Sequence, residues 1–99
     1  MTRTDIIRCI KEKLPELQQT YGVKRIGLFG SVSTGRFTGK SDVDLVIEFD
    51  KPIGFAFCDL VEDLENLLGR RVDVLTPDGV NSIRVPSVAE SIRESTIYV

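Results

Sequence analysis

An alternation of acidic and apolar residues in the middle of the chain constrains the fold more than any other feature. The strand that we predict over 42–49 begins Asp-Val-Asp-Leu-Val-Ile, and successive side chains of a β-strand point to opposite faces. Asp42 and Asp44 therefore project from one face, while Val43 and Leu45 point to the other. Two carboxylates this close repel one another unless a cation lies between them, and Mg²⁺ is bound by oxygen ligands of this kind. We expect this strand to hold a metal ion.

A turn of small residues precedes the acidic strand. The apolar run that ends at Phe29 predicts a short strand over 25–29, followed directly by Gly30 and Ser31. Residues 31–35 suffice for one helical turn, whose first backbone N–H groups have no partners within the helix and can bind an anion. We therefore predict that this turn binds phosphate. The polar loop that follows carries Arg36 and Lys40, and both side chains are able to approach a triphosphate.

The order strand, helix, strand in the second half of the chain indicates a βαβ unit. An amphipathic helix is predicted over 54–68, and a strand over 70–76 again alternates an acid with β-branched residues. Such a crossover places the two strands in one sheet, and we expect them to be parallel. Asp73 then lies beside the carboxylate pair. The predicted inner side of the helix comprises Phe57, Leu60, Val61, Leu64, Leu67 and Leu68.

The N-terminal segment has the apolar spacing of an amphipathic helix over 4–21. Thr4 or Thr2 is the candidate N-cap, and Gly22 supplies a helix stop. Pro15 removes one backbone hydrogen bond, so we expect a kink or two helical pieces that meet there.

The C-terminal segment is predicted in three parts. Residues 77–79 read Pro-Asp-Gly, which is typical of a turn, while 86–94 suit a short helix that starts at a proline. Residues 96–99 could add an edge strand. The fold class is therefore α/β (α+β), with a small mixed β-sheet.

Composition limits the function further. With 99 residues and a net charge of −2, the chain is one domain without a general basic surface for nucleic acid. It contains no histidine, which excludes histidine-based triads and acid–base catalysis. Catalysis must then depend on carboxylates, hydroxyls and bound metal. We find neither an apolar run long enough for a membrane span nor a signal peptide, so we expect a cytoplasmic protein with Cys9 and Cys58 as buried free thiols.

Each motif also has a plainer interpretation. An Asp-x-Asp pair on a strand is most often a solvated face, and a Gly-Ser pair is often an ordinary turn. The combination of both with a third acid in the next strand favours a nucleotidyl transfer centre. Residues 35–41 resemble a Walker A loop, but three residues separate the glycines instead of four and a strand follows instead of a helix, so we reject that motif. Phe55 and Phe57 are expected in the core.

Taken together, these motifs resemble the minimal nucleotidyltransferases of the DNA polymerase β superfamily. The likeness covers about residues 20–78 and implies the nucleotidyltransferase fold, with helices packed mainly on one face of the sheet, as a single domain over 1–99. The matching motifs are Leu-Phe-Gly-Ser at 28–31, Gly35, Ser-Asp-Val-Asp-Leu at 41–45 and Leu-Gly-Arg-Arg-Val-Asp-Val-Leu-Thr at 68–76.

The resemblance also implies residue roles. Gly30 and Ser31 would bind the triphosphate, Asp42 and Asp44 would hold two Mg²⁺ ions, and Asp73 would complete the site. Many members of the family have Ala-Arg-Gly after the Gly-Ser turn, where this chain has Ser-Thr-Gly at 33–35. Thr34 therefore stands where the family has an arginine, and Arg36 is a candidate substitute.

Small members of this family commonly act as antitoxins for a separate HEPN ribonuclease toxin. The resemblance therefore implies transfer of AMP from ATP to a tyrosine of such a toxin by a two-metal mechanism. One alternative is an antitoxin that neutralises its toxin by binding alone. Another is nucleotidyl transfer to a small molecule, for which a chain of this size has no spare domain to shape a pocket.

Overall fold

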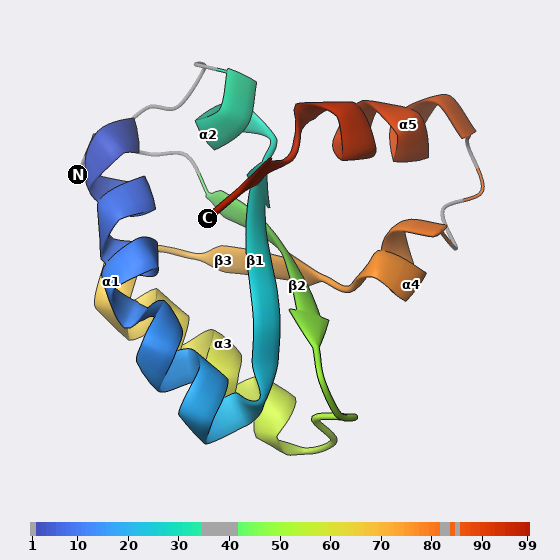
Figure 1. Cartoon of the computed structure of the whole chain (residues 1–99). Coiled ribbons are helices and arrows are strands. Elements are labelled where there is room, and N and C mark those ends of the chain that lie inside the picture. Colours follow the sequence, from blue (N-terminus) through green and yellow to red (C-terminus); the bar gives the residue numbers. More distant parts are fainter. Residues whose placement is uncertain (1, 35–41, 82–83, 85) are drawn as a thin grey trace.

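The computed structural model describes residues 2–34, 42–81, 84 and 86–99. These residues form one β-sheet with helices on both of its faces (Figure 1). The predicted loop with Arg36 and Lys40, together with Gly35 and Ser41, lies outside the described residues. The helices are α1 Arg3–Tyr21, α2 Ser31–Thr34, α3 Ala56–Leu68, α4 Pro77–Asn81 and α5 Pro86–Ser95. The strands are β1 Val23–Phe29, β2 Val43–Phe49, β3 Val72–Leu75 and β4 Ile97–Tyr98.

The described strands form a mixed sheet in the order β3-β2-β1-β4. β2 pairs with β1 in antiparallel and with β3 in parallel, which confirms the predicted βαβ crossover through α3. β4 pairs with β1 in antiparallel at the edge, as expected for residues 96–99. Gly27 allows this close pairing, because a Cβ atom built there would overlap with the side chain of Thr96. The predicted fold class is therefore confirmed.

The helix α1 is continuous from Arg3 to Tyr21, so the expectation of two helical pieces at Pro15 is wrong, while the alternative of a kink stays a prediction. Pro15 has no backbone N–H, so the helix loses one hydrogen bond there. Buried residues on both sides of Pro15, including Ile10 and Leu17, keep the helix packed against the core. Thr2 is the N-cap: its hydroxyl accepts from the backbone N–H of Asp5, whose carboxylate accepts from the N–H of Thr2.

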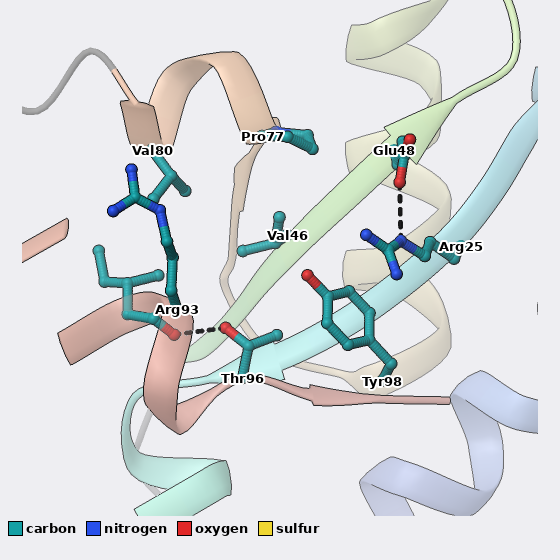
Figure 2. Close-up of a pocket in the computed structure, with 9 residues that line it drawn as sticks. Arg25, Val46, Glu48, Pro77, Val80, Arg93, Thr96 and Tyr98 are labelled. Carbon is teal, nitrogen blue, oxygen red and sulfur yellow. Dashed lines mark hydrogen bonds and ion pairs between the residues drawn. The ribbon is translucent and has the colours of Figure 1, made fainter. Parts of the chain in front are cut away.

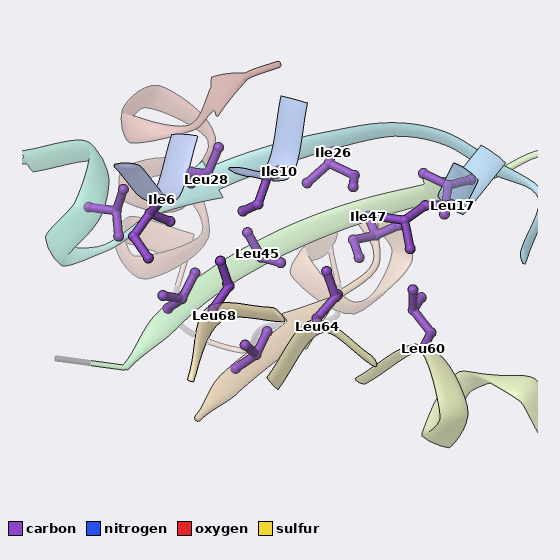
Figure 3. Close-up of a cluster of buried hydrophobic side chains, with 14 residues drawn as sticks. Ile6, Ile10, Leu17, Ile26, Leu28, Leu45, Ile47, Leu60, Leu64 and Leu68 are labelled. Carbon is purple, nitrogen blue, oxygen red and sulfur yellow. The ribbon is translucent and has the colours of Figure 1, made fainter. Parts of the chain in front are cut away.

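The main core lies between the sheet and the two long helices, α1 and α3 (Figure 3). The strands contribute the residues that point to this face, which leaves the alternate residues on the other face. Burial of each such side chain stabilises the fold by about 1.5–3 kcal/mol. The fully buried members include Ile6, Ile10, Leu17, Ile26, Leu28, Leu45, Ile47, Leu60 and Leu64.

A second, smaller cluster lies on the opposite face of the sheet, beneath α4 and α5. It contains Phe29 of β1, Val46 of β2, Val80 of α4 and Ala89 of α5. The helix α5 confirms the predicted helix over 86–94. The helices are therefore concentrated on one face, as expected, while α4 and α5 cover part of the other.

The predicted turn at 77–79 is wrong, because these residues begin α4. Thr76 makes the difference: its hydroxyl accepts from the N–H of Gly79 at 3.1 Å, and its carbonyl accepts from the N–H of Val80 at 3.0 Å. Pro77 suits the first helical position, since its missing N–H would have no partner within the helix.

Two expectations of burial are also wrong. Phe55 is fully exposed, because Gly54 adopts a positive φ of 61° and α3 begins only at Ala56, whereas Phe57 is half-buried. Cys58 lies on the exposed side of α3 and Cys9 is half-buried, although both thiols are free as expected.

Candidate active site

The carboxylate of Asp44 lies on the face of the sheet that carries the smaller cluster. Val43 and Leu45 are fully buried in the main core, so Asp44, which alternates with them, points to the opposite face. Asp44 is half-buried, and Asp42, which immediately precedes β2, is exposed. Neither carboxylate is enclosed in the hydrophobic interior.

Asp73 lies beside Asp44 on the neighbouring strand. The parallel register of β2 and β3 pairs Asp44 with Asp73 directly, and Asp73 is exposed. Burial raises the pKa of Asp44, and the charges of Asp73 and Asp42 together with a hydrogen bond to Asp73 raise it further. The three acids that the sequence singled out are thus electrostatic neighbours.

Gly30 lies directly against the carboxylate of Asp44. Its φ is 69°, and a Cβ atom built there would overlap with Oδ2 of Asp44. The antiparallel register explains this proximity, because the preceding residue, Phe29, pairs with Asp44. The short helix α2 begins at Ser31, and the hydroxyl of Ser33 donates to the carbonyl of Gly30 at 3.1 Å. The predicted phosphate-binding turn and the acidic group therefore meet at one place.

The chemistry of these donors fits a divalent cation. All three side chains offer carboxylate oxygens, which Mg²⁺ prefers, and their mutual repulsion is the condition that a cation relieves. Across the described part of the chain, no three acidic, cysteine or histidine side chains are already arranged to surround a metal ion. Asp73 already lies against Asp44, and Asp42 is exposed, so its side chain is free to rotate toward them.

One contact near this site was not predicted from the sequence. The guanidinium of Arg3, in the first turn of α1, donates from Nε to the backbone carbonyl of Val32 in α2. The two residues are 29 positions apart, and no periodicity or motif indicates their contact.

A pocket of about 200 Å³ lies farther along the same face of the sheet (Figure 2). Nε of Arg25 donates to Oε2 of Glu48 at 2.7 Å, and the guanidinium lies 4.3 Å from the centre of the Tyr98 ring. Val46, the next residue of β2 to face this side after Asp44, lines the pocket. None of the three aspartates lines this pocket. We therefore place the candidate active site at the carboxylates and not in the pocket.

Among the described residues, no helix is both long and apolar enough to cross a membrane.

Comparisons with known proteins show which family the chain is similar to. A model of the nucleotidyltransferase domain family matches residues 7–99. A protein of Methanocaldococcus jannaschii, named by inference as protein adenylyltransferase MJ1379, is 39% identical over 101 residues, covering 99% of this chain and 98% of the relative. The protein adenylyltransferase MntA of Thermococcus cleftensis is 33% identical over 100 residues, covering 100% of this chain and 97% of the relative.

Solved structures show the same fold. One assigned as a minimal nucleotidyltransferase is 28% identical with a TM-score of 0.73, covering 98% of this chain and 95% of that one. A chain from a toxin–antitoxin crystal structure with AMP-PNP is 20% identical with a TM-score of 0.62, covering 99% of this chain and 72% of that one. By the domain model, these relatives and the shared fold, the chain belongs to the nucleotidyltransferase domain family.

Proposed function

We propose that this protein is an antitoxin that transfers AMP from ATP to a tyrosine hydroxyl of a HEPN-family toxin. The observation that carries the proposal is the contact between Gly30 and Asp44, with Asp73 and Asp42 beside them. It joins a candidate phosphate-binding turn to a group of carboxylates. Relatives named as protein adenylyltransferases support AMP transfer to a protein, and the fold shared with a toxin–antitoxin structure supports the class of partner.

The proposed reaction is an in-line displacement at the α-phosphorus of ATP. The acceptor oxygen forms a new bond to this phosphorus, the bond to the oxygen that bridges to the β-phosphorus breaks, and pyrophosphate leaves. The hydroxyl proton passes to Asp73 or to water, because the chain has no histidine to accept it. The products are pyrophosphate and a toxin with AMP joined to its tyrosine through a phosphodiester bond.

Each site residue has a separate role in this proposal. Asp42 and Asp44 would hold two Mg²⁺ ions, with Asp73 as a further ligand on the acceptor side. Bound Mg²⁺ supplies positive charge for the phosphoryl oxygens and lowers the pKa of the acceptor hydroxyl. Gly30 and Ser31 would orient the β- and γ-phosphates through backbone N–H groups, and Gly30 leaves the room that the Asp44 carboxylate occupies.

The test is labelling of a HEPN-family toxin from the same organism with ATP that carries a radioactive α-phosphate, in the presence of Mg²⁺. We expect label on the toxin with the natural protein, and a loss on the order of 100-fold or more with Asp44→Asn or Asp42→Asn. Asp59→Asn is the matched control, because Asp59 is an exposed acid on α3. It should transfer label at the natural rate.

The outcomes separate the alternatives. If the natural protein and Asp44→Asn both neutralise the toxin and neither leaves label, the protein acts by binding alone. Label on a small-molecule acceptor without label on the toxin would favour that acceptor instead. Full activity of Asp44→Asn would show that the active site does not lie at these carboxylates.

A further inference from the structure

The contact between Arg3 and Val32 connects two elements at the same end of the molecule, the start of α1 and the helix α2 (Figure 1). The bond is part-buried, and the side chain of Val32 is fully buried in the main core. Because a guanidinium carries a charge, its hydrogen bond to a carbonyl is stronger than one between neutral groups. Arg3 therefore attaches α2 to the first turn of α1.

The helix α2 needs external support. It has four residues, which amounts to about one turn, and a single helical turn is unstable by itself. Among the described contacts, the hydroxyl of Ser33 holds the turn internally through the carbonyl of Gly30, and Val32 anchors it in the core. Among the hydrogen bonds of the described residues, the one from Arg3 reaches α2 from another secondary structure element.

The position of α2 determines where its first residues lie relative to the acidic group. Gly30 directly precedes α2 and touches Asp44, so a small rotation of α2 would move the turn against that carboxylate. No cationic residue occurs from Gly30 to Thr34, and Arg3 brings a positive charge to this segment from a distant part of the chain.

We propose that Arg3 is a positioning residue for ATP: its bond to the carbonyl of Val32 holds α2 so that the turn at Gly30 and Ser31 is set for the triphosphate. This inference rests on the proposed function, since it concerns the same turn. It gives Arg3 no direct contact with the nucleotide. Loss of Arg3 should therefore weaken ATP binding and loosen α2 even when no nucleotide is present.

The experiment compares Arg3→Gln and Arg3→Lys with Arg8→Gln. Arg8 is the matched control, because it lies on the same helix and bonds Asp5 at 2.9 Å instead of α2. The KM for ATP and kcat are measured with the toxin in excess, and hydrogen–deuterium exchange is followed for residues 31–34 without nucleotide. Arg3→Gln should raise KM roughly tenfold, the effect of one hydrogen bond from a charged donor, and change kcat less than about twofold.

Exchange at residues 31–34 should be faster in Arg3→Gln and unchanged in Arg8→Gln. Arg3→Lys should recover most of both effects, because lysine also donates a charged hydrogen bond. Arg3→Met, whose side chain is of similar length but donates no hydrogen bond, serves as the test variant if Arg3→Gln does not fold. An unchanged KM in Arg3→Gln overturns the inference. A raised KM with unchanged exchange also overturns it, because Arg3 would then act on the nucleotide directly.

The result is distinguishable from failure of the proposed function. If the natural protein leaves no label on the toxin, the proposed function fails. If the natural protein labels the toxin and Arg3→Gln does so with the same KM, the positioning role fails alone.

Discussion

At the scale of single residues, Gly30 has two constraints that act together. Its φ of 69° is one that residues with a Cβ atom rarely adopt, and the space where that atom would lie is taken by Oδ2 of Asp44. The first constraint concerns folding, since any side chain adds strain at that φ. The second concerns the site, since any side chain displaces a carboxylate that we expect to bind metal.

Gly30→Ala should therefore lose both stability and activity. The left-handed backbone costs about 1–2 kcal/mol of unfolding free energy for a residue with a Cβ atom. Gly22→Ala is the matched control: its φ is 70°, and nothing lies within 4 Å of its Cβ position. Both variants should be destabilised by a similar amount in urea unfolding, whereas only Gly30→Ala should lose AMP transfer. Equal activity in the two folded variants would contradict a role for the Gly30–Asp44 contact.

At the scale of secondary structure elements, α1 and α3 are linked at the surface by a hydrogen bond from the hydroxyl of Tyr21 to the carboxylate of Asp63. This bond, together with partial burial and the nearby charges of Asp63, Asp59 and Glu16, raises the pKa of Tyr21 to about 12. The phenol therefore holds its proton more tightly in the folded chain than in the unfolded one. The link depends on a neutral tyrosine.

Alkaline pH should weaken this link. The folded pKa of Tyr21 is raised from 10.0 to about 12, so its contribution to stability is complete below pH 10 and is lost as the pH rises through 12. Tyr21→Phe removes that dependence, and the difference in unfolding free energy between the natural protein and this variant should shrink across the same range. Thermal unfolding at several pH values measures it. A constant difference would show that the bond does not form in solution.

At the scale of the whole molecule, the sheet separates two apolar clusters of unequal size. The larger cluster joins α1 and α3 to the sheet and supplies most of the burial, whereas the smaller one holds α4 and α5 on the face of the sheet to which Asp44 points. Stability should therefore depend mainly on the side of the sheet that faces away from the proposed chemistry. This division leaves the carboxylate face partly open.

A pair of substitutions on α3 and the turn before it compares a side chain buried in the larger cluster with one in solvent. Leu64 is fully buried, so Leu64→Ala should cost about 2–5 kcal/mol of unfolding free energy. Phe55 is 102% exposed, so Phe55→Ala should change stability by less than about 0.5 kcal/mol although it removes a larger side chain. Urea unfolding measures both. A large loss in Phe55→Ala would mean that this phenyl ring is covered in solution.

Much of the fold could be predicted because it depends on local patterns. The helix stop at Gly22, the alternation along β2 and the crossover through α3 follow from residue type and spacing. The errors occurred where one neighbour overrides a local preference. Thr76 caps a helix where Pro-Asp-Gly favours a turn, and the positive φ of Gly54 leaves Phe55 in solvent.

The candidate site divides in the same way. By itself the sequence determined that Asp44 alternates with the buried Val43 and Leu45 and that Asp73 follows on a parallel strand, because strand alternation and crossover order are local properties. Only the tertiary structure decided that Asp44 is half-buried against Gly30 and that Arg3 reaches Val32. These contacts join residues far apart in the chain, and their distances depend on how the packed helices and sheet bring those residues together.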